Sequence, residues 1–148
     1  FRRVLFRSLG EAVVVLDPAA APNVDYARKA SAQLASKMRF VSAQLEVLLG
    51  TDLWLLNAEH ANAMAQRLAA GLDGLVEIPR PVQANAVFAR LPRPVIDRLR
   101  ETYAFYDWDE SVDEVRWMTA WDTTPEDVDT FVADVRAALS THAEPVTA

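Results

Sequence analysis

The feature that most constrains the fold is a change in hydrophobic spacing near Gly74. Residues 25–50 are rich in Ala, Leu, Lys, Arg and Gln and contain no proline, a composition that favours helix. After Gly74, short β-like runs at 75–81 and 84–91 replace the helical spacing. The sequence therefore predicts long helices followed by a unit in which strands and helices are mixed.

Two helices are predicted before this change. The first covers residues 25–50 and stops at Gly50, because glycine is common at the C-terminal end of a helix. The second follows Thr51, a suitable N-cap, and ends at Gly71. Five side chains at helical spacing are expected near one face of the second helix: Leu53, Leu56, His60, Met64 and Leu68.

Residues 75–140 predict the order strand, strand, helix, strand, strand, helix. The strands are expected at 75–81, 84–91, 104–108 and 114–121, and the short helix at 94–103. The last helix has a clear start, with Thr124 as N-cap, Pro125 as first helical residue and Asp127 at the capping-box position. These elements predict a small antiparallel sheet with helices on one face.

The first eight residues, FRRVLFRS, differ from the rest of the chain because they hold three arginines and no acid. A signal peptide would have a longer apolar stretch and a cleavage site, and eight residues are too few for an isolated amphipathic helix. The octet is also the translation of a DNA string that resembles a sequencing adapter. We therefore interpret residues 1–8 as non-native, with the native sequence beginning at Leu9, inside a longer protein.

The expected domain organisation follows from these observations. Residues 9–72 are predicted to hold the last strand of a larger sheet, at 12–16, and the two helices. Residues 73–141 are predicted to form the small α+β domain, and residues 142–148 a disordered tail.

Composition excludes several classes of function. The chain has no cysteine and only two histidines, so disulfides and thiolate or zinc sites are not expected. Its formal net charge of −6 makes nucleic acid a poor candidate partner. The longest apolar runs are far shorter than the roughly 20 residues of a membrane-spanning helix.

Arg116 is the leading candidate for a binding residue. It lies inside a predicted strand between Val115 and Trp117, where a charge is costly unless it is paired. Its guanidinium suits bidentate contact with a substrate carboxylate, whereas a salt bridge to a nearby acid is the structural alternative. The residues alone leave these two alternatives open.

Two other groups of residues favour structural roles. His60, on a helix beside apolar neighbours, is expected to be packed and hydrogen-bonded. The acidic residues between 107 and 114 match no calcium-binding loop, so we expect a solvated turn between strands and no metal site.

Several motifs together resemble the C-terminal part of the low-specificity L-threonine aldolases. They are QLASKMRFVSAQ, EHANAMAQRLA, PVQANAVFARLP, AFYDWD and EVRWMTAWDTTPEDVD, and the resemblance runs from Leu9 to about Leu139. It implies an α/β fold, as the C-terminal part of an aminotransferase-like (fold type I) enzyme that uses pyridoxal 5'-phosphate. One strand left from the large domain, long helices and a small α+β domain would make up the chain.

The resemblance also assigns roles to individual residues. Arg116 matches the family's arginine for the substrate carboxylate, and Arg39 matches a basic position near the cofactor phosphate. Asn85 matches a recurrent asparagine whose role is structural or functional. The Schiff-base lysine of the family precedes the strand at 12–16, a place occupied here by residues 1–8. The resemblance therefore leaves this chain with no catalytic residue.

The implied reaction cleaves L-threonine or L-allo-threonine to glycine and an aldehyde. The resemblance further implies a cytoplasmic homodimer or homotetramer with a small amino-acid substrate. This chain alone is then expected to be inactive. A stand-alone α+β module for binding or oligomerisation, without chemistry, is the alternative.

Overall fold

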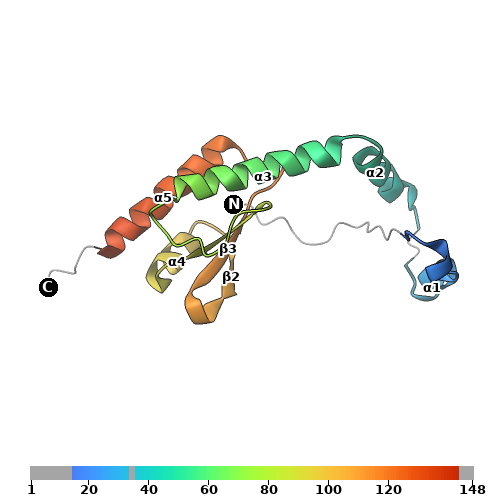
Figure 1. Ribbon diagram of the computed structural model, residues 1–148, viewed down its shortest axis with the longest axis horizontal. Coiled ribbons are helices and arrows are strands. Elements are labelled where there is room, and N and C mark those ends of the chain that lie inside the picture. Colours follow the sequence, from blue (N-terminus) through green and yellow to red (C-terminus); the bar gives the residue numbers. More distant parts are fainter. Residues whose placement is uncertain (1–14, 34–35, 144–148) are drawn as a thin grey trace. The chain divides into compact units, whose positions relative to one another are not determined.

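The computed structural model describes residues 15–33 and 36–143 of the 148-residue chain (Figure 1). The octet at 1–8, the end of the expected tail and most of the strand expected at 12–16 lie outside these residues. The chain divides into two compact units near residue 55, within helix α3 (Leu53–Gly71). The reason is that the later turns of α3 bury Ala61, Ala65 and Leu68 in the second unit.

The first unit contains a short 3-10 turn and two helices. These are η1 (Pro18–Ala20), α1 (Val24–Ala30) and α2 (Arg39–Gly50). The described end of the expected strand at 12–16 is not extended into a sheet, and Leu16 is 93% exposed. No neighbouring strand among the described residues is available to pair with it.

The single helix predicted over 25–50 is wrong, because the helical structure is interrupted between α1 and α2. Ala32 and Lys37 have φ values of 54° and 64°, which a right-handed helix does not allow. Helices in proteins are stabilised mainly by packing an apolar face, and Val41 is the one buried residue among those described in this unit. The predicted end at Gly50 is confirmed.

The second unit begins within helix α3 (Leu53–Gly71) and continues as a small α+β fold. It contains β1 (Ala86–Arg90), α4 (Arg93–Arg100), β2 (Tyr106–Asp109), the 3-10 turn η2 (Glu110–Val112), β3 (Glu114–Met118) and α5 (Pro125–Ala143). The strands form one antiparallel sheet in the order β1-β3-β2. The antiparallel sheet is confirmed, and α5 continues two residues beyond the predicted domain end.

Of the four predicted strands, the first in chain order, at 75–81, is wrong. This segment makes one isolated bridge, between Glu77 and Arg90. Pro79 and Pro81 have no backbone N–H, so the segment cannot continue a ladder of hydrogen bonds along β1.

The core lies on one face of the sheet. Val87 pairs with Trp117 and Ala89 with Val115, and all four side chains are buried. Residues from α3, α4 and α5 cover them, among them Leu68, Ile96 and Phe131. Figure 1 shows α3 and α5 running together over the sheet. The predicted placement of helices on one face is confirmed.

Local contacts fix the two long helices. Thr124 and Asp127 form the predicted capping box: the Thr124 backbone N–H donates to the Asp127 carboxylate (2.9 Å), and the Asp127 N–H donates to the Thr124 hydroxyl (3.1 Å). The α3 helix ends at Gly71, as predicted. A Cβ at Gly71 would lie 2.8 Å from a methyl carbon of Val132, so only glycine permits this approach of α3 to α5.

Candidate functional site

Arg116 lies on the sheet face opposite the core. Side chains alternate along β3, so the burial of Val115 and Trp117 directs Arg116 to the other face. Its cross-strand partners are Phe88 on β1 and Tyr106 on β2. We call this surface the open face, defined by Phe88, Tyr106, Trp108, Arg116 and Met118. A charge inside the apolar strand is tolerated because it belongs to this second face.

The guanidinium of Arg116 lies against an aromatic ring. Its Cζ is 5.2 Å from the centroid of the Trp108 ring, a cation–π contact. The Trp108 ring in turn meets Phe88 edge to face, with centroids 5.0 Å apart. Aromatic residues therefore surround the side of the sheet from which Arg116 projects.

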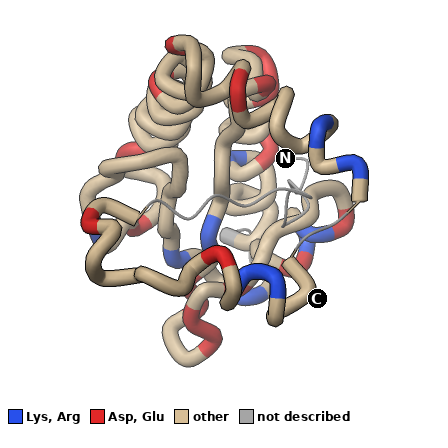
Figure 2. The backbone as a smooth tube through the Cα atoms, turned by 90° about the vertical axis from the view of Figure 1, so that its right-hand side faces the viewer, with Lys and Arg blue, Asp and Glu red and all other residues tan. Residues whose placement is uncertain are grey.

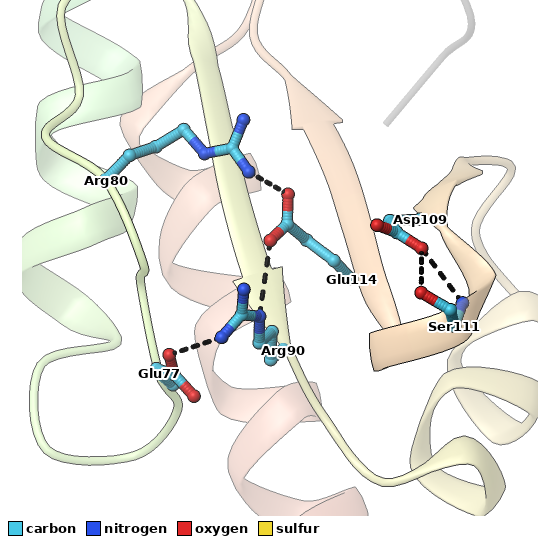
Figure 3. A network of polar contacts seen from close by, with 6 residues as sticks. All are labelled: Glu77, Arg80, Arg90, Asp109, Ser111 and Glu114. Carbon is cyan, nitrogen blue, oxygen red and sulfur yellow. Dashed lines mark hydrogen bonds and ion pairs between the residues drawn. The ribbon is translucent and has the colours of Figure 1, made fainter.

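The acids nearest to Arg116 in sequence are paired with other arginines. Glu114 is 1% exposed and accepts hydrogen bonds from Arg80 and, at 3.3 Å, from the Nε of Arg90 (Figure 3). Arg90 also donates to Glu77 at 2.8 Å. The close-up shows the Glu114 carboxylate between the two guanidinium groups.

A second cluster of the same kind connects α4 to β2 and to the turn after it. Arg93 donates to Asp107 and Asp113, both at 2.9 Å, and Arg100 pairs with Asp107 at 2.7 Å. Burial alone would raise the pKa of Asp107, but hydrogen bonds from Arg100 and Arg93 outweigh it and lower the pKa. Asp109 caps η2 through the backbone N–H and hydroxyl of Ser111 (Figure 3).

The structure therefore does not support the salt-bridge interpretation of Arg116. Acidic and basic residues are mixed along the backbone (Figure 2), and five arginines of the second unit are in ion pairs: Arg67, Arg80, Arg90, Arg93 and Arg100. Within residues 15–33 and 36–143, Arg116 makes no ion pair.

Asn85 and His60 have structural contacts. The side-chain amide of Asn85 donates to the backbone carbonyl of Thr119 (2.8 Å). The backbone carbonyl of Asn85 accepts from the backbone N–H of Thr119 (3.0 Å). A ring nitrogen of His60 lies 2.7 Å from the Thr123 carbonyl oxygen, which confirms the expected hydrogen bond, although His60 is exposed rather than packed. The predicted apolar face of α3 is partly wrong, since Leu53 and Leu56 are exposed. The buried residues of α3 are Ala61, Ala65 and Leu68.

Arg39 belongs to the other compact unit. It is the first residue of α2, is exposed, and its Cζ lies 5.0 Å from the Phe40 ring. The lysines of the chain, Lys29 and Lys37, are exposed in the same unit. No group of three or more residues able to hold a metal ion occurs in the part of the chain that the structure describes.

Sequence reasoning missed the residues around Arg116 on the open face. Neither Trp108 nor Arg80 is among the candidate residues named from the sequence. The signal for Trp108 was its position two residues after Tyr106, on the same predicted strand. No local signal identifies Arg80, because it contacts Glu114 across 34 residues of sequence.

Comparison with solved structures indicates the class: the chain matches part of an aminotransferase-like, fold type I enzyme. The chain resembles the structure of Leishmania major threonine aldolase with a TM-score of 0.73 and 26% identity, over 84% of this chain and 38% of that one. No family model matches the sequence. No helix among the described residues has the length and apolar character needed to span a membrane.

Two bacterial proteins are more similar in sequence. The chain is 40% identical over 137 residues to a low specificity L-threonine aldolase of a Pseudomonas species, covering 90% of this chain and 39% of the relative. It is 38% identical over 138 residues to the low specificity L-threonine aldolase of Pseudomonas aeruginosa, covering 89% and 39%. The chain is thus similar over about nine tenths of its length to low specificity L-threonine aldolases, and it spans about two fifths of the length of these relatives.

Proposed function

We propose that this chain supplies the substrate-carboxylate site of an aldolase that cleaves L-threonine or L-allo-threonine to glycine and an aldehyde. The observation that carries the proposal is the state of Arg116. It projects from the open face beside aromatic rings, while Arg80 and Arg90 occupy the buried acid Glu114. Similarity to the two Pseudomonas aldolases supports the same assignment.

Arg116 would act by binding and orientation. Its planar guanidinium matches a carboxylate with two parallel hydrogen bonds, which fixes the rotation of the bound amino acid as well as its position. Holding the Cα–Cβ bond in the orientation needed for cleavage is a positioning contribution to the rate. Asn85 would contribute indirectly, because its side chain links the segment just before β1 to the segment just after β3.

Threonine aldolases in general depend on pyridoxal phosphate, and we propose that the described residues alone do not form a complete site for it. Its Schiff base needs a positioned lysine, and Lys29 and Lys37 are both exposed side chains. We therefore propose that the chain alone has no aldolase activity and binds the cofactor weakly. Arg39 is proposed as a contact of the cofactor phosphate in the complete enzyme, on the strength of its motif and exposure.

Assembly is a further part of the proposal. Large apolar side chains are exposed on α2 and on the first turns of α3: Phe40, Val47, Leu49, Trp54 and Leu56. Exposed apolar surface of this extent is typical of a protein interface. It supports the proposed homodimer or homotetramer, and a non-catalytic oligomerisation module would show the same feature. A cytoplasmic location is proposed from the resemblance alone.

The test is a chimera in which residues 9–148 of this chain replace the segment of the Pseudomonas aeruginosa relative that they match. We expect the chimera to release glycine and aldehyde from L-threonine. We expect the 148-residue chain alone to do neither and to show no saturable absorbance change with added pyridoxal phosphate. A folded, cofactor-loaded chimera without cleavage would contradict the aldolase assignment. Stoichiometric cofactor binding and cleavage by the chain alone would contradict its expected inactivity.

A further inference from the structure

Four side chains form a continuous row across the open face. Arg80 lies over the Phe88 ring, with its Cζ 4.3 Å from the centroid. Phe88 meets Trp108 edge to face at 5.0 Å, and Arg116 lies over Trp108 at 5.2 Å. Two aromatic rings therefore separate two guanidinium groups that would otherwise repel each other.

The two arginines at the ends of this row differ in their ion pairing. Arg80 is ion-paired to Glu114, whose carboxylate is almost completely buried and would be costly to leave unpaired. Arg116, at the other end, contacts the Trp108 ring and makes no ion pair among the described residues. The ion-paired Arg80 thus packs on the Phe88 ring, and this ring contacts the Trp108 ring that lies against Arg116.

Trp108 owes its position to a β-bulge. Asp107 pairs with Val115 and Asp109 with Glu114, so Trp108 is an extra residue of β2 with no partner of its own on β3. Bulges redirect a side chain relative to the regular pleat and are frequent beside active sites. Here the extra residue is the one whose ring lies beneath Arg116.

A cation–π contact differs from an ion pair in what it leaves available. It stabilises the guanidinium through the ring face and uses no hydrogen-bond acceptor, so it does not occupy the N–H donors of Arg116. The contact also restricts a long side chain that would otherwise lose rotamer freedom when a ligand binds. Both effects favour a preorganised carboxylate-binding group.

We propose that Trp108 is the positioning residue for Arg116, holding its guanidinium ready for the substrate carboxylate. This inference rests on the proposed function of Arg116. It is not a catalytic role, because Trp108 acts through the arginine. The bulge of β2 and the row formed by Arg80 and Phe88 hold Trp108 itself in place.

The contact is tested by NMR on the 148-residue chain, without cofactor or substrate. The ring current of Trp108 is expected to shift the side-chain proton signals of Arg116 upfield. Trp108→Leu should return them to the values of a solvated arginine, and Trp108→Phe should keep part of the shift. Trp121→Leu is the matched control, because Trp121 is 65% exposed and lies outside this row. Unchanged Arg116 signals in folded Trp108→Leu would overturn the proposal.

The positioning role is tested by kinetics in the chimera. Trp108→Leu is expected to raise KM for L-threonine about tenfold with unchanged cofactor content, and Trp108→Phe to restore most of the loss. If Arg116→Lys impairs the chimera but Trp108→Leu leaves KM unchanged, the positioning role is refuted and the proposed function stands. If neither variant changes the kinetics, the carboxylate role of Arg116 is refuted and the positioning role with it.

Discussion

The two faces of the small sheet are built from alternate residues of the same strands but have opposite chemistry. Val87 and Trp117 face the helices and are buried in the hydrophobic core. Phe88 and Arg116, each one residue away along the same strands, face the other way among aromatic rings and ion pairs. The comparison teaches that one β-strand can carry stability on one face and recognition on the other. Substitutions on the two faces should then affect different measurements.

The largest expected effect is on the core face. Phe131→Ala removes a fully buried ring that packs edge-on against Trp117 (5.0 Å) and Tyr103 (4.8 Å). We expect the free energy of unfolding to fall by about 3–5 kcal/mol, measured by urea denaturation of the chain. Trp121→Ala, at an exposed position, should change it by less than about 0.5 kcal/mol. Similar losses in the two variants would show that the core face is not packed as described.

Next in size is a kinetic effect on the open face. In the chimera, Arg116→Lys should raise KM and lower kcat for L-threonine, because one ammonium cannot reproduce a bidentate contact. A combined loss of about 30- to 1000-fold in kcat/KM, or about 2–4 kcal/mol, is expected, with stability unchanged. The control is Arg136→Lys, at an exposed position on α5. Reduced stability with normal kinetics would make Arg116 a structural residue.

The smallest effect concerns Asp107, which pairs with Arg93 and Arg100 of α4. Its pKa is lowered in the folded chain, because the two arginine hydrogen bonds outweigh the effect of burial. A lowered folded pKa stabilises the fold above the unfolded pKa, and this stabilisation is lost as the pH falls through the folded pKa.

As the pH falls through the pKa of Asp107 in the folded chain, the wild-type chain should therefore lose more stability than Asp107→Asn. Urea denaturation at several pH values measures this difference, and the control Asp97→Asn, at an exposed position on α4, should follow the wild type. Identical pH profiles for wild type and Asp107→Asn would show that the cluster contributes nothing to folding.

Features that depend on neighbouring residues could be predicted from the sequence. The capping box of Thr124 and Asp127 and the helix ends at Gly50 and Gly71 need only a few adjacent residues, and all of them are confirmed. The antiparallel sheet with helices on one face also follows from local spacing. The helix over 25–50 fails because propensity alone does not supply a packing partner.

The state of Arg116 could not be predicted, because it depends on distant residues. Whether its charge is paired is decided by Arg80 and Arg90, which lie 34 and 24 residues from Glu114 in sequence. The bulge at Trp108 also could not be predicted, because no local residue pattern indicates it. Sequence reasoning could name Arg116 as a candidate but left its two interpretations equal.

The bulge in β2 also bears on how the sheet meets other chains. This strand lies at one edge of the three-stranded sheet, is four residues long and carries Asp107 and Asp109. Short length, acidic residues and a bulge each hinder the addition of a foreign strand to an open edge. Edge-to-edge aggregation through β2 is therefore opposed by the same irregularity that places Trp108.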